Sequence, residues 1–71
     1  GDWEGAVAAY RRCLEIDPTN TRSYLSLGRL LLSRGEREEA LRWLRHGARA
    51  AAQPELVAGA LREAEAGATE N

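Results

Sequence analysis

Apolar and small residues at helical spacing organise the stretch from Tyr24 to Gly47. In its first half, Tyr24, Leu27, Gly28 and Leu31 stand at i, i+3, i+4 and i+7, which places them on one stripe of a helix. Gly35 interrupts this period, and a second stripe follows at Ala40, Leu41, Leu44, Gly47, Ala48 and Ala51. Gly28, Ala40 and Gly47 lie inside the stripes, where a larger side chain would hold two backbones apart. The stretch therefore predicts a tight antiparallel helical hairpin.

The sequence also repeats itself with a period of 34 residues, because Gly1, Ala6 and Arg11 align with Gly35, Ala40 and Arg45. A period of 34 with one helix-turn-helix per unit is typical of tetratricopeptide repeats. The chain resembles that family in three motifs, which are Tyr-x-x-Leu-Gly-x-x-Leu from Tyr24, Gly-Asp-Trp-x-x-Ala at 1–6 and Asp-Pro-Thr-Asn at 17–20. This resemblance covers about residues 1–52, or one and a half repeats.

The resemblance implies an all-α fold, a superhelix fragment of antiparallel helical hairpins with four helices in one domain over residues 1–71. Residues 2–17 would form the second helix of a partial repeat, with Asp2 as its cap or in its first turn and with Pro18 ending it. Residues 21–52 would form a complete repeat whose first helix spans 21–34. Residues 54–67 would form an amphipathic capping helix, and 68–71 a frayed tail. Because Pro54 stands two residues beyond the period, we expect the second helix of the complete repeat to be slightly longer.

Composition excludes several classes of protein. The chain is 44% hydrophobic, with no apolar run of membrane-spanning length and no signal peptide, so we predict no membrane association. It begins at Gly1 and lacks methionine, which predicts a processed or excised piece. Its net charge is −1 and its central arginines are interleaved with glutamates, which argues against nucleic-acid binding. A single cysteine favours a reducing compartment such as the cytoplasm, without determining it.

Residues that could carry chemistry are isolated from one another. His46 is the only histidine and points away from the apolar stripe, so we interpret it as a solvated surface residue. Cys13 occupies the small-residue position that Gly47 holds one period later, which favours packing over reactivity. No second histidine or cysteine at metal spacing completes a metal site, and no nucleophile or phosphate-binding motif is present. The sequence therefore predicts a protein without catalytic activity, metal or cofactor.

Trp43 lies about a quarter turn from the main stripe of its helix, from the 3.6-residue period. One interpretation is that Trp43 packs against the capping helix near Leu56 and Val57. The alternative is that it is an exposed aromatic anchor for a partner.

The helix over 21–34 carries a second, mixed arc opposite its inner stripe. This arc collects Arg22, Leu25, Ser26, Arg29, Leu32 and Ser33. In arrays that resemble this chain, first helices line a concave groove, and this arc faces a bound peptide. Two leucines beside two arginines suit a segment with apolar side chains and a carboxylate. A mixed solvated surface with two exposed leucines is the alternative.

The sequence as a whole predicts an interaction scaffold that docks a protein or peptide, with acidic groups on the partner, on this arc. Only Arg29 corresponds to the carboxylate clamp of the chaperone-adaptor subfamily, so that specificity is not predicted. The alternative function is self-association into a homo-oligomer through the uncovered face of the first helix, around Trp3 and Tyr10.

Overall fold

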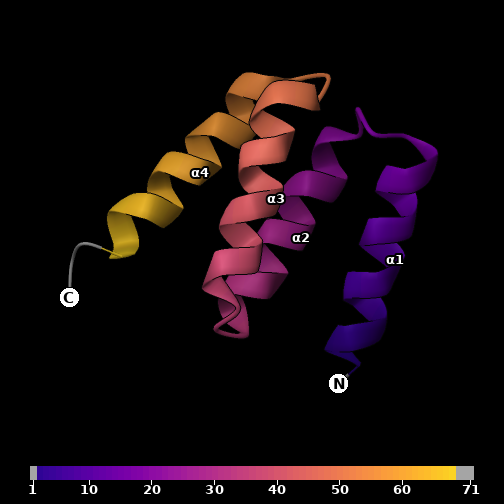
Figure 1. Cartoon of the computed structure of the whole chain (residues 1–71), viewed down its shortest axis with the longest axis horizontal. Coiled ribbons are helices and arrows are strands. Elements are labelled where there is room, and N and C mark those ends of the chain that lie inside the picture. The colour runs from indigo at the N-terminus through magenta and orange to yellow at the C-terminus, as the bar shows by residue number, and fades with distance from the viewer. Residues whose placement is uncertain (1, 69–71) are drawn as a thin grey trace.

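The computed structural model of this 71-residue chain describes residues 2–68. It contains four α-helices, α1 (Trp3–Ile16), α2 (Thr21–Ser33), α3 (Arg37–Ala50) and α4 (Pro54–Ala68), and the described residues include no strand. Successive helices run in opposite directions (Figure 1), and the Cα atoms span 37 × 30 × 14 Å, so they form one thin layer. The predicted all-α architecture of antiparallel helical hairpins is confirmed.

Side-chain caps fix where the first two helices begin. The Oδ1 atom of Asp2 accepts a hydrogen bond from the Gly5 N–H at 2.9 Å. Asn20 repeats this arrangement at the start of α2, where its Oδ1 accepts from the Ser23 N–H at 3.0 Å. Each cap satisfies an N–H group that has no partner inside its helix. The two helices begin at Trp3 and Thr21, within one residue of the starts that the sequence predicted.

Gly35 ends α2 through its backbone conformation. Its φ of 79° is the only positive φ among the described residues, and a glycine adopts it without a Cβ clash. The Gly35 N–H donates to the Leu32 carbonyl at 3.0 Å, and the Glu36 N–H donates to the Leu31 carbonyl at 2.9 Å. This pair of bonds is a Schellman motif, which satisfies the last carbonyls of α2 and turns the chain into α3.

The end of α3 differs from the prediction. We expected this helix to reach about Ala52, but it ends at Ala50. Its length of 14 residues equals that of α1. Pro54 begins α4, where the helix over 54–67 was expected to start, because the first position of a helix needs no N–H donor. The Ala52 N–H donates to the Thr19 carbonyl at 2.8 Å, so the two closing turns, one period apart, are tied to each other.

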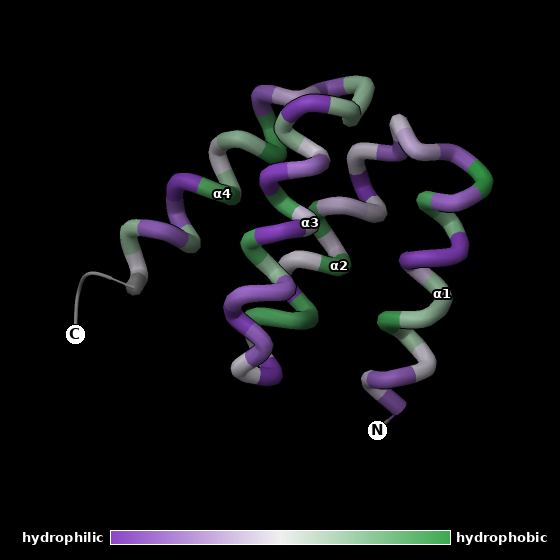
Figure 2. Tube along the Cα trace, in the orientation of Figure 1, coloured by the Kyte–Doolittle hydropathy of each residue, from purple (hydrophilic) through white to green (hydrophobic). Residues whose placement is uncertain are grey.

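The core lies along the predicted stripes, which appear in Figure 2 as hydrophobic positions recurring along each helix. Tyr24, Leu27 and Ala40 are completely buried. A Cβ atom added to Gly28 would lie 2.6 Å from the Leu44 side chain, and one added to Gly47 would lie 2.6 Å from the Tyr24 ring. The close approach of α2 and α3 that the small residues predicted is therefore present at both glycines.

The fourth helix covers one side of this hairpin. Helix α4 contacts both α2 and α3, and it contributes the completely buried Val57. Arg37 at the start of α3 donates from Nη1 to the Ala64 carbonyl at 3.0 Å, which links the far half of α4 to the hairpin. The predicted frayed tail over 68–71 differs at its first residue because α4 continues to Ala68. Residues 69–71 lie outside the described part of the chain.

Candidate functional site

A hollow of about 450 Å³ opens on the face that α2 and α4 share. It brings together four of the six residues that the sequence predicted for partner binding, together with three residues that the sequence analysis did not assign to the site. Its lining consists of Thr21, Arg22, Leu25, Ser26, Arg29, Gln53 and Leu56. The first half of α2 therefore forms one wall of the hollow, and the start of α4 forms the other.

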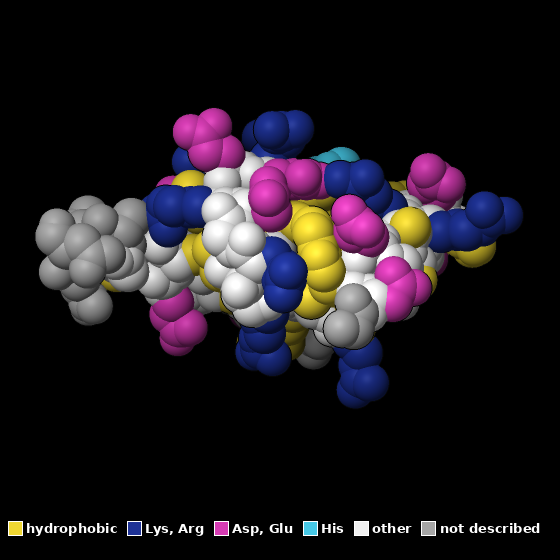
Figure 3. All heavy atoms as spheres, turned by 90° about the horizontal axis from the view of Figure 1, so that it is seen from below, with side chains coloured by type: hydrophobic (Ala, Val, Ile, Leu, Met, Phe, Trp, Pro, Cys, Tyr) yellow, Lys and Arg dark blue, Asp and Glu magenta, His cyan; other side chains and the backbone are white. Residues whose placement is uncertain are grey.

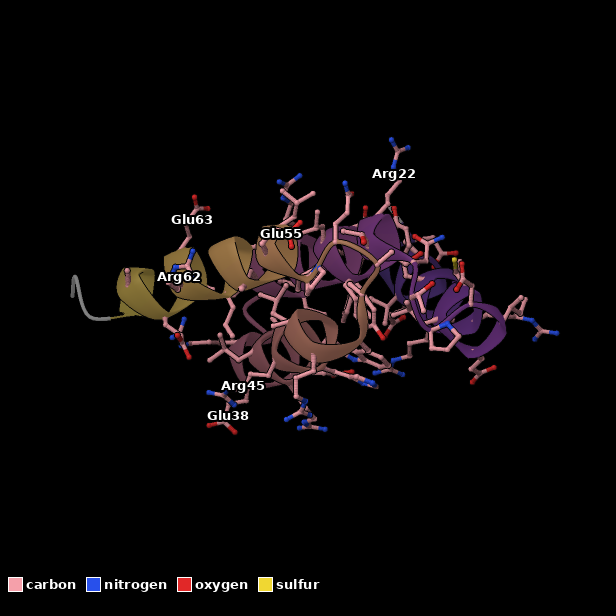
Figure 4. The ribbon with its side chains drawn as sticks, turned by 90° about the horizontal axis from the view of Figure 1, so that it is seen from above. Arg22, Glu38, Arg45, Glu55, Arg62 and Glu63 are labelled. Carbon is pink, nitrogen blue, oxygen red and sulfur yellow. The ribbon has the colours of Figure 1, made fainter. Side chains whose placement is uncertain are left out.

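The charged groups of this hollow are exposed and available. Arg22 and Arg29 are both exposed, and within residues 2–68 neither takes part in an ion pair. They are seven residues apart, so both lie on the same face of α2, about 10 Å apart along its axis. Figure 4 shows Arg22 and Glu55 projecting to one side of the layer, while Arg45 projects to the other.

The two leucines of the predicted arc are less exposed than we expected. Leu25 and Leu32 are half-buried and pack against the hydrophobic core. The reason is that α4 contacts α2, so part of this arc is a helix–helix contact. Leu32 and Ser33 do not line the hollow, and the exposed Ser33 donates from its hydroxyl to the Leu30 carbonyl at 2.7 Å.

Leu56 is the main residue of the hollow that sequence reasoning missed. Leu56 belongs to the predicted capping helix beside Val57, yet its side chain is 49% exposed. Of these two adjacent apolar residues, Val57 is buried and Leu56 is half exposed. Helical periodicity alone does not tell which of two neighbours on a stripe is the buried one. The available signal was the start of α4 directly after Gln53, which places Leu56 in its first turn beside α2.

The face around Trp3 and Tyr10 on α1, predicted for self-association, is half-buried. The Arg34 guanidinium lies 5.0 Å from the centre of the Trp3 ring, a cation–π contact that covers part of the indole. Trp3 also borders a second hollow with Val7 and Leu31, at the end of the layer where Figure 3 shows hydrophobic atoms among acidic and basic side chains. The most exposed large apolar residue of α1 is Ile16, at 79%.

Cys13 also lies on α1, and it is half-buried rather than buried as predicted. Its Sγ accepts a hydrogen bond from the Ser23 hydroxyl at 2.8 Å. The equivalent Gly47 of α3 is covered by Tyr24 of α2. Within the described residues no helix covers α1 from the corresponding side, which explains the difference.

Trp43 does not lie where the first of its two interpretations placed it. Instead of packing near Leu56 and Val57, its ring lies 6.5 Å from that of Tyr24 and lines a hollow with Leu14 of α1. The physical reason is its register, because a residue a quarter turn from the stripe faces α1 or α4 according to the direction of that turn. His46 is exposed, as predicted, and its ring stacks on Trp43.

Two titratable groups near the α1–α2 turn have shifted pKa values, Asp17 in the turn and Tyr24 in the first part of α2. The Thr19 hydroxyl donates to the Asp17 carboxylate at 2.7 Å and the Thr19 N–H donates to it at 3.1 Å, which together lower the pKa of Asp17. Burial raises the pKa of Tyr24, and the charge of Asp17 adds to that shift. The neutral Tyr24 hydroxyl donates to the Pro18 carbonyl at 2.7 Å, so the helix–turn contact requires the protonated phenol.

Comparison with known proteins identifies the family. A family model described as tetratricopeptide repeat matches residues 1–65 of the chain. The chain therefore belongs to the tetratricopeptide repeat family, and the match extends into α4, past the residues 1–52 on which the sequence resemblance was based. Neither the curated proteins nor the solved structures contain a significant match.

Membership of this family carries a general function. Tetratricopeptide repeats generally mediate protein–protein interactions, typically bind proteins or peptides and generally act as scaffolds without catalysis. Over residues 2–68, no three His, Cys, Asp or Glu side chains are grouped so as to hold a metal ion. None of the helices in this range has the length and apolar character needed to cross a membrane.

Proposed function

We propose that this chain is an interaction domain that binds an acidic, leucine-bearing segment of a protein partner in the α2–α4 hollow. The observation that carries the proposal is the juxtaposition of two unpaired arginines, Arg22 and Arg29, with the half-exposed Leu56. A carboxylate of the partner pairs with a guanidinium, and an apolar side chain covers Leu25 and Leu56. Leu32 and Ser33, farther along α2, extend the same face.

The chemistry of the hollow explains why the partner is acidic. Arginine presents several N–H donors in a planar fork that matches a carboxylate. Because Arg22 and Arg29 are exposed at the rim of the hollow, they act mainly on the rate of association and on its salt dependence. The apolar contact with Leu25 and Leu56 would determine the rate of dissociation.

The test measures binding of a fluorescently labelled acidic peptide that carries two leucines one helical turn apart. Arg29→Glu is expected to lower the association rate constant at low salt by about tenfold and to flatten its salt dependence. Arg45→Glu is the control, because it makes the same charge change on the opposite side of the layer (Figure 4); it also removes the exposed Arg45–Glu65 ion pair, so circular dichroism must show that its helicity is unchanged. Equal losses in both variants, or no loss in Arg29→Glu with unchanged helicity, would remove the assignment of this face.

Self-association through α1 is the second candidate function, and one observation favours it. In α3, Ala40, Leu44 and Gly47 are buried under α2. The equivalent residues of α1, one period earlier, are only half-buried. A second copy of the chain could cover this face, around Trp3 and Tyr10. Sedimentation at rising concentration tests the idea, since a strict monomer at high concentration excludes it.

A further inference from the structure

An aromatic pair on α3 forms a second surface, away from the α2–α4 hollow. The rings of Trp43 and His46 stack with their planes 9° apart and their centres 6.2 Å apart. The ring of Tyr24 lies 5.6 Å from that of His46. Trp43 is half-buried and His46 is exposed, so the pair presents a rigid aromatic edge to solvent. Neither the proposed binding in the α2–α4 hollow nor the packing of the core requires His46 to take this position.

The stacked pair separates two hollows. One, of about 290 Å³, lies between α1 and α3 and is lined by Arg11, Leu14, Glu15, Pro18, Tyr24, Trp43 and His46. Its apolar lining includes the completely buried Tyr24 and the buried Leu14. The other, of about 230 Å³, is lined by Arg42, Trp43, His46 and Arg49. Helices α1 and α3 make no direct backbone contact in the described part of the chain, which leaves room for a side chain between them.

The charge around these hollows is positive. Arg42 and Arg49 are exposed, lie seven residues apart on one face of α3 and take part in no ion pair within residues 2–68. Arg11 is already paired with Glu39 across the α1–α3 gap. Glu15 is the one acid in the lining of the two hollows. An approaching segment therefore meets an aromatic hollow between α1 and α3, with two unpaired guanidinium groups in the adjoining hollow.

We infer that this α1–α3 surface binds an acidic peptide segment that inserts one aromatic side chain between the helices. The inserted ring packs against the half-buried Trp43 in tilted or offset geometry, which aromatic pairs prefer. Carboxylates of the same segment reach across the Trp43–His46 stack into the adjoining hollow and pair with Arg42 and Arg49, which lie about two helical turns, or about 10 Å, apart. Tryptophan and arginine together are the residue types most enriched among the residues that dominate binding energy at interfaces.

An acidic peptide fits this surface better than a nucleic acid does. Single-stranded nucleic acids also combine aromatic stacking with basic side chains, so they are the main competing ligand. They require a continuous positive track, however, and here Glu15 and the Glu39 paired to Arg11 interrupt it. The net charge of −1 also disfavours a polyanion.

The test follows the fluorescence of Trp43 in the full chain with Trp3→Phe, which leaves Trp43 as the single tryptophan. The probe is an acidic peptide with one central phenylalanine. We expect a saturable change in emission, which is lost when the phenylalanine is replaced by alanine or the acids by lysines. In this background, Arg42→Ser combined with Arg49→Ser should weaken binding at least about tenfold.

The matched control is Arg22→Ser combined with Arg29→Ser, which removes the same charge from the α2–α4 hollow. The inference predicts that this control binds the phenylalanine peptide within about twofold of the parent, whatever happens to binding in the α2–α4 hollow. The four arginines are exposed, whereas Trp3 is half-buried, so circular dichroism verifies the helicity of the Trp3→Phe parent and of each variant. No saturable change, an equal loss in the control, or tighter binding of a single-stranded oligonucleotide would each overturn the inference.

Discussion

Gly47 is the position at which an added methyl group tests the packing of α2 on α3 most sharply. Its Cβ would lie 2.6 Å from Cγ and 2.9 Å from Cβ of Tyr24. These atoms are close to the α2 backbone, and the ring is completely buried with its hydroxyl bound to the Pro18 carbonyl. Tyr24 therefore has no rotamer change that relieves the contact, and α3 must move away from α2.

The magnitude follows from two opposing effects. Replacing glycine by alanine inside a helix normally stabilises it by about 1 kcal/mol. Overpacking a well-packed core costs about 1–3 kcal/mol. Gly59→Ala is the matched control, because Gly59 lies inside α4 and an added Cβ meets nothing within 4 Å. We therefore expect Gly47→Ala to have a free energy of unfolding about 1–3 kcal/mol below that of Gly59→Ala.

Urea denaturation followed by far-ultraviolet circular dichroism measures this difference. In thermal melts the Tm of Gly47→Ala should lie at least about 4 °C below that of Gly59→Ala, given the usual sensitivity of domains of this size. If Gly47→Ala were as stabilising as Gly59→Ala, the two helices would not be in close contact at this glycine. The reasoning about small residues in the stripes would then be refuted.

Two further predictions concern a turn and a titratable group. Gly35→Ala should lower the free energy of unfolding by about 1–2 kcal/mol in urea titrations, because its φ of 79° strains any residue with a Cβ; an unchanged midpoint would contradict the Schellman geometry. Because folding raises the pKa of Tyr24, its contribution to stability is complete below the unfolded pKa of about 10 and is lost as pH rises through the higher folded pKa. In thermal melts at pH values above about 10, Tyr24→Phe should reduce the fall of Tm with rising pH. If Tm fell as steeply in Tyr24→Phe as in the parent, Tyr24 would not be the source of the alkaline loss.

Much of the fold was accessible from the sequence because local chemistry determines it. The 34-residue period located the first three helices and an amphipathic pattern located the fourth, Asp2 capped the first where expected, and Gly35 turned the chain. In each case the cause lies within a few residues of the effect. The predicted end of α3 was wrong because it was placed from the position of Pro54, whereas α3 ends at Ala50 and three non-helical residues lead to Pro54.

The predictions that were wrong concern side chains whose surroundings depend on which helix packs beside them. Trp43 faces α1 and Leu56 faces the hollow beside α2, but a helical period gives only the angle between residues on one helix. Half-burial of Leu25 and Leu32 likewise depends on α4 lying against α2. His46 stacks on Trp43, three residues away on the same helix. The sequence analysis considered the two residues separately and did not predict this contact.

The most direct measurement for the α2–α4 hollow is a charge-exchange cycle across the interface. Binding of the acidic, leucine-bearing peptide and of its lysine-substituted counterpart would be measured to the parent chain, to Arg29→Glu and to Arg45→Glu. The account predicts that Arg29→Glu loses affinity for the acidic peptide and regains affinity with the lysine peptide, while Arg45→Glu keeps the preference of the parent. The same exchange of preference in Arg45→Glu, or none in Arg29→Glu, would contradict it.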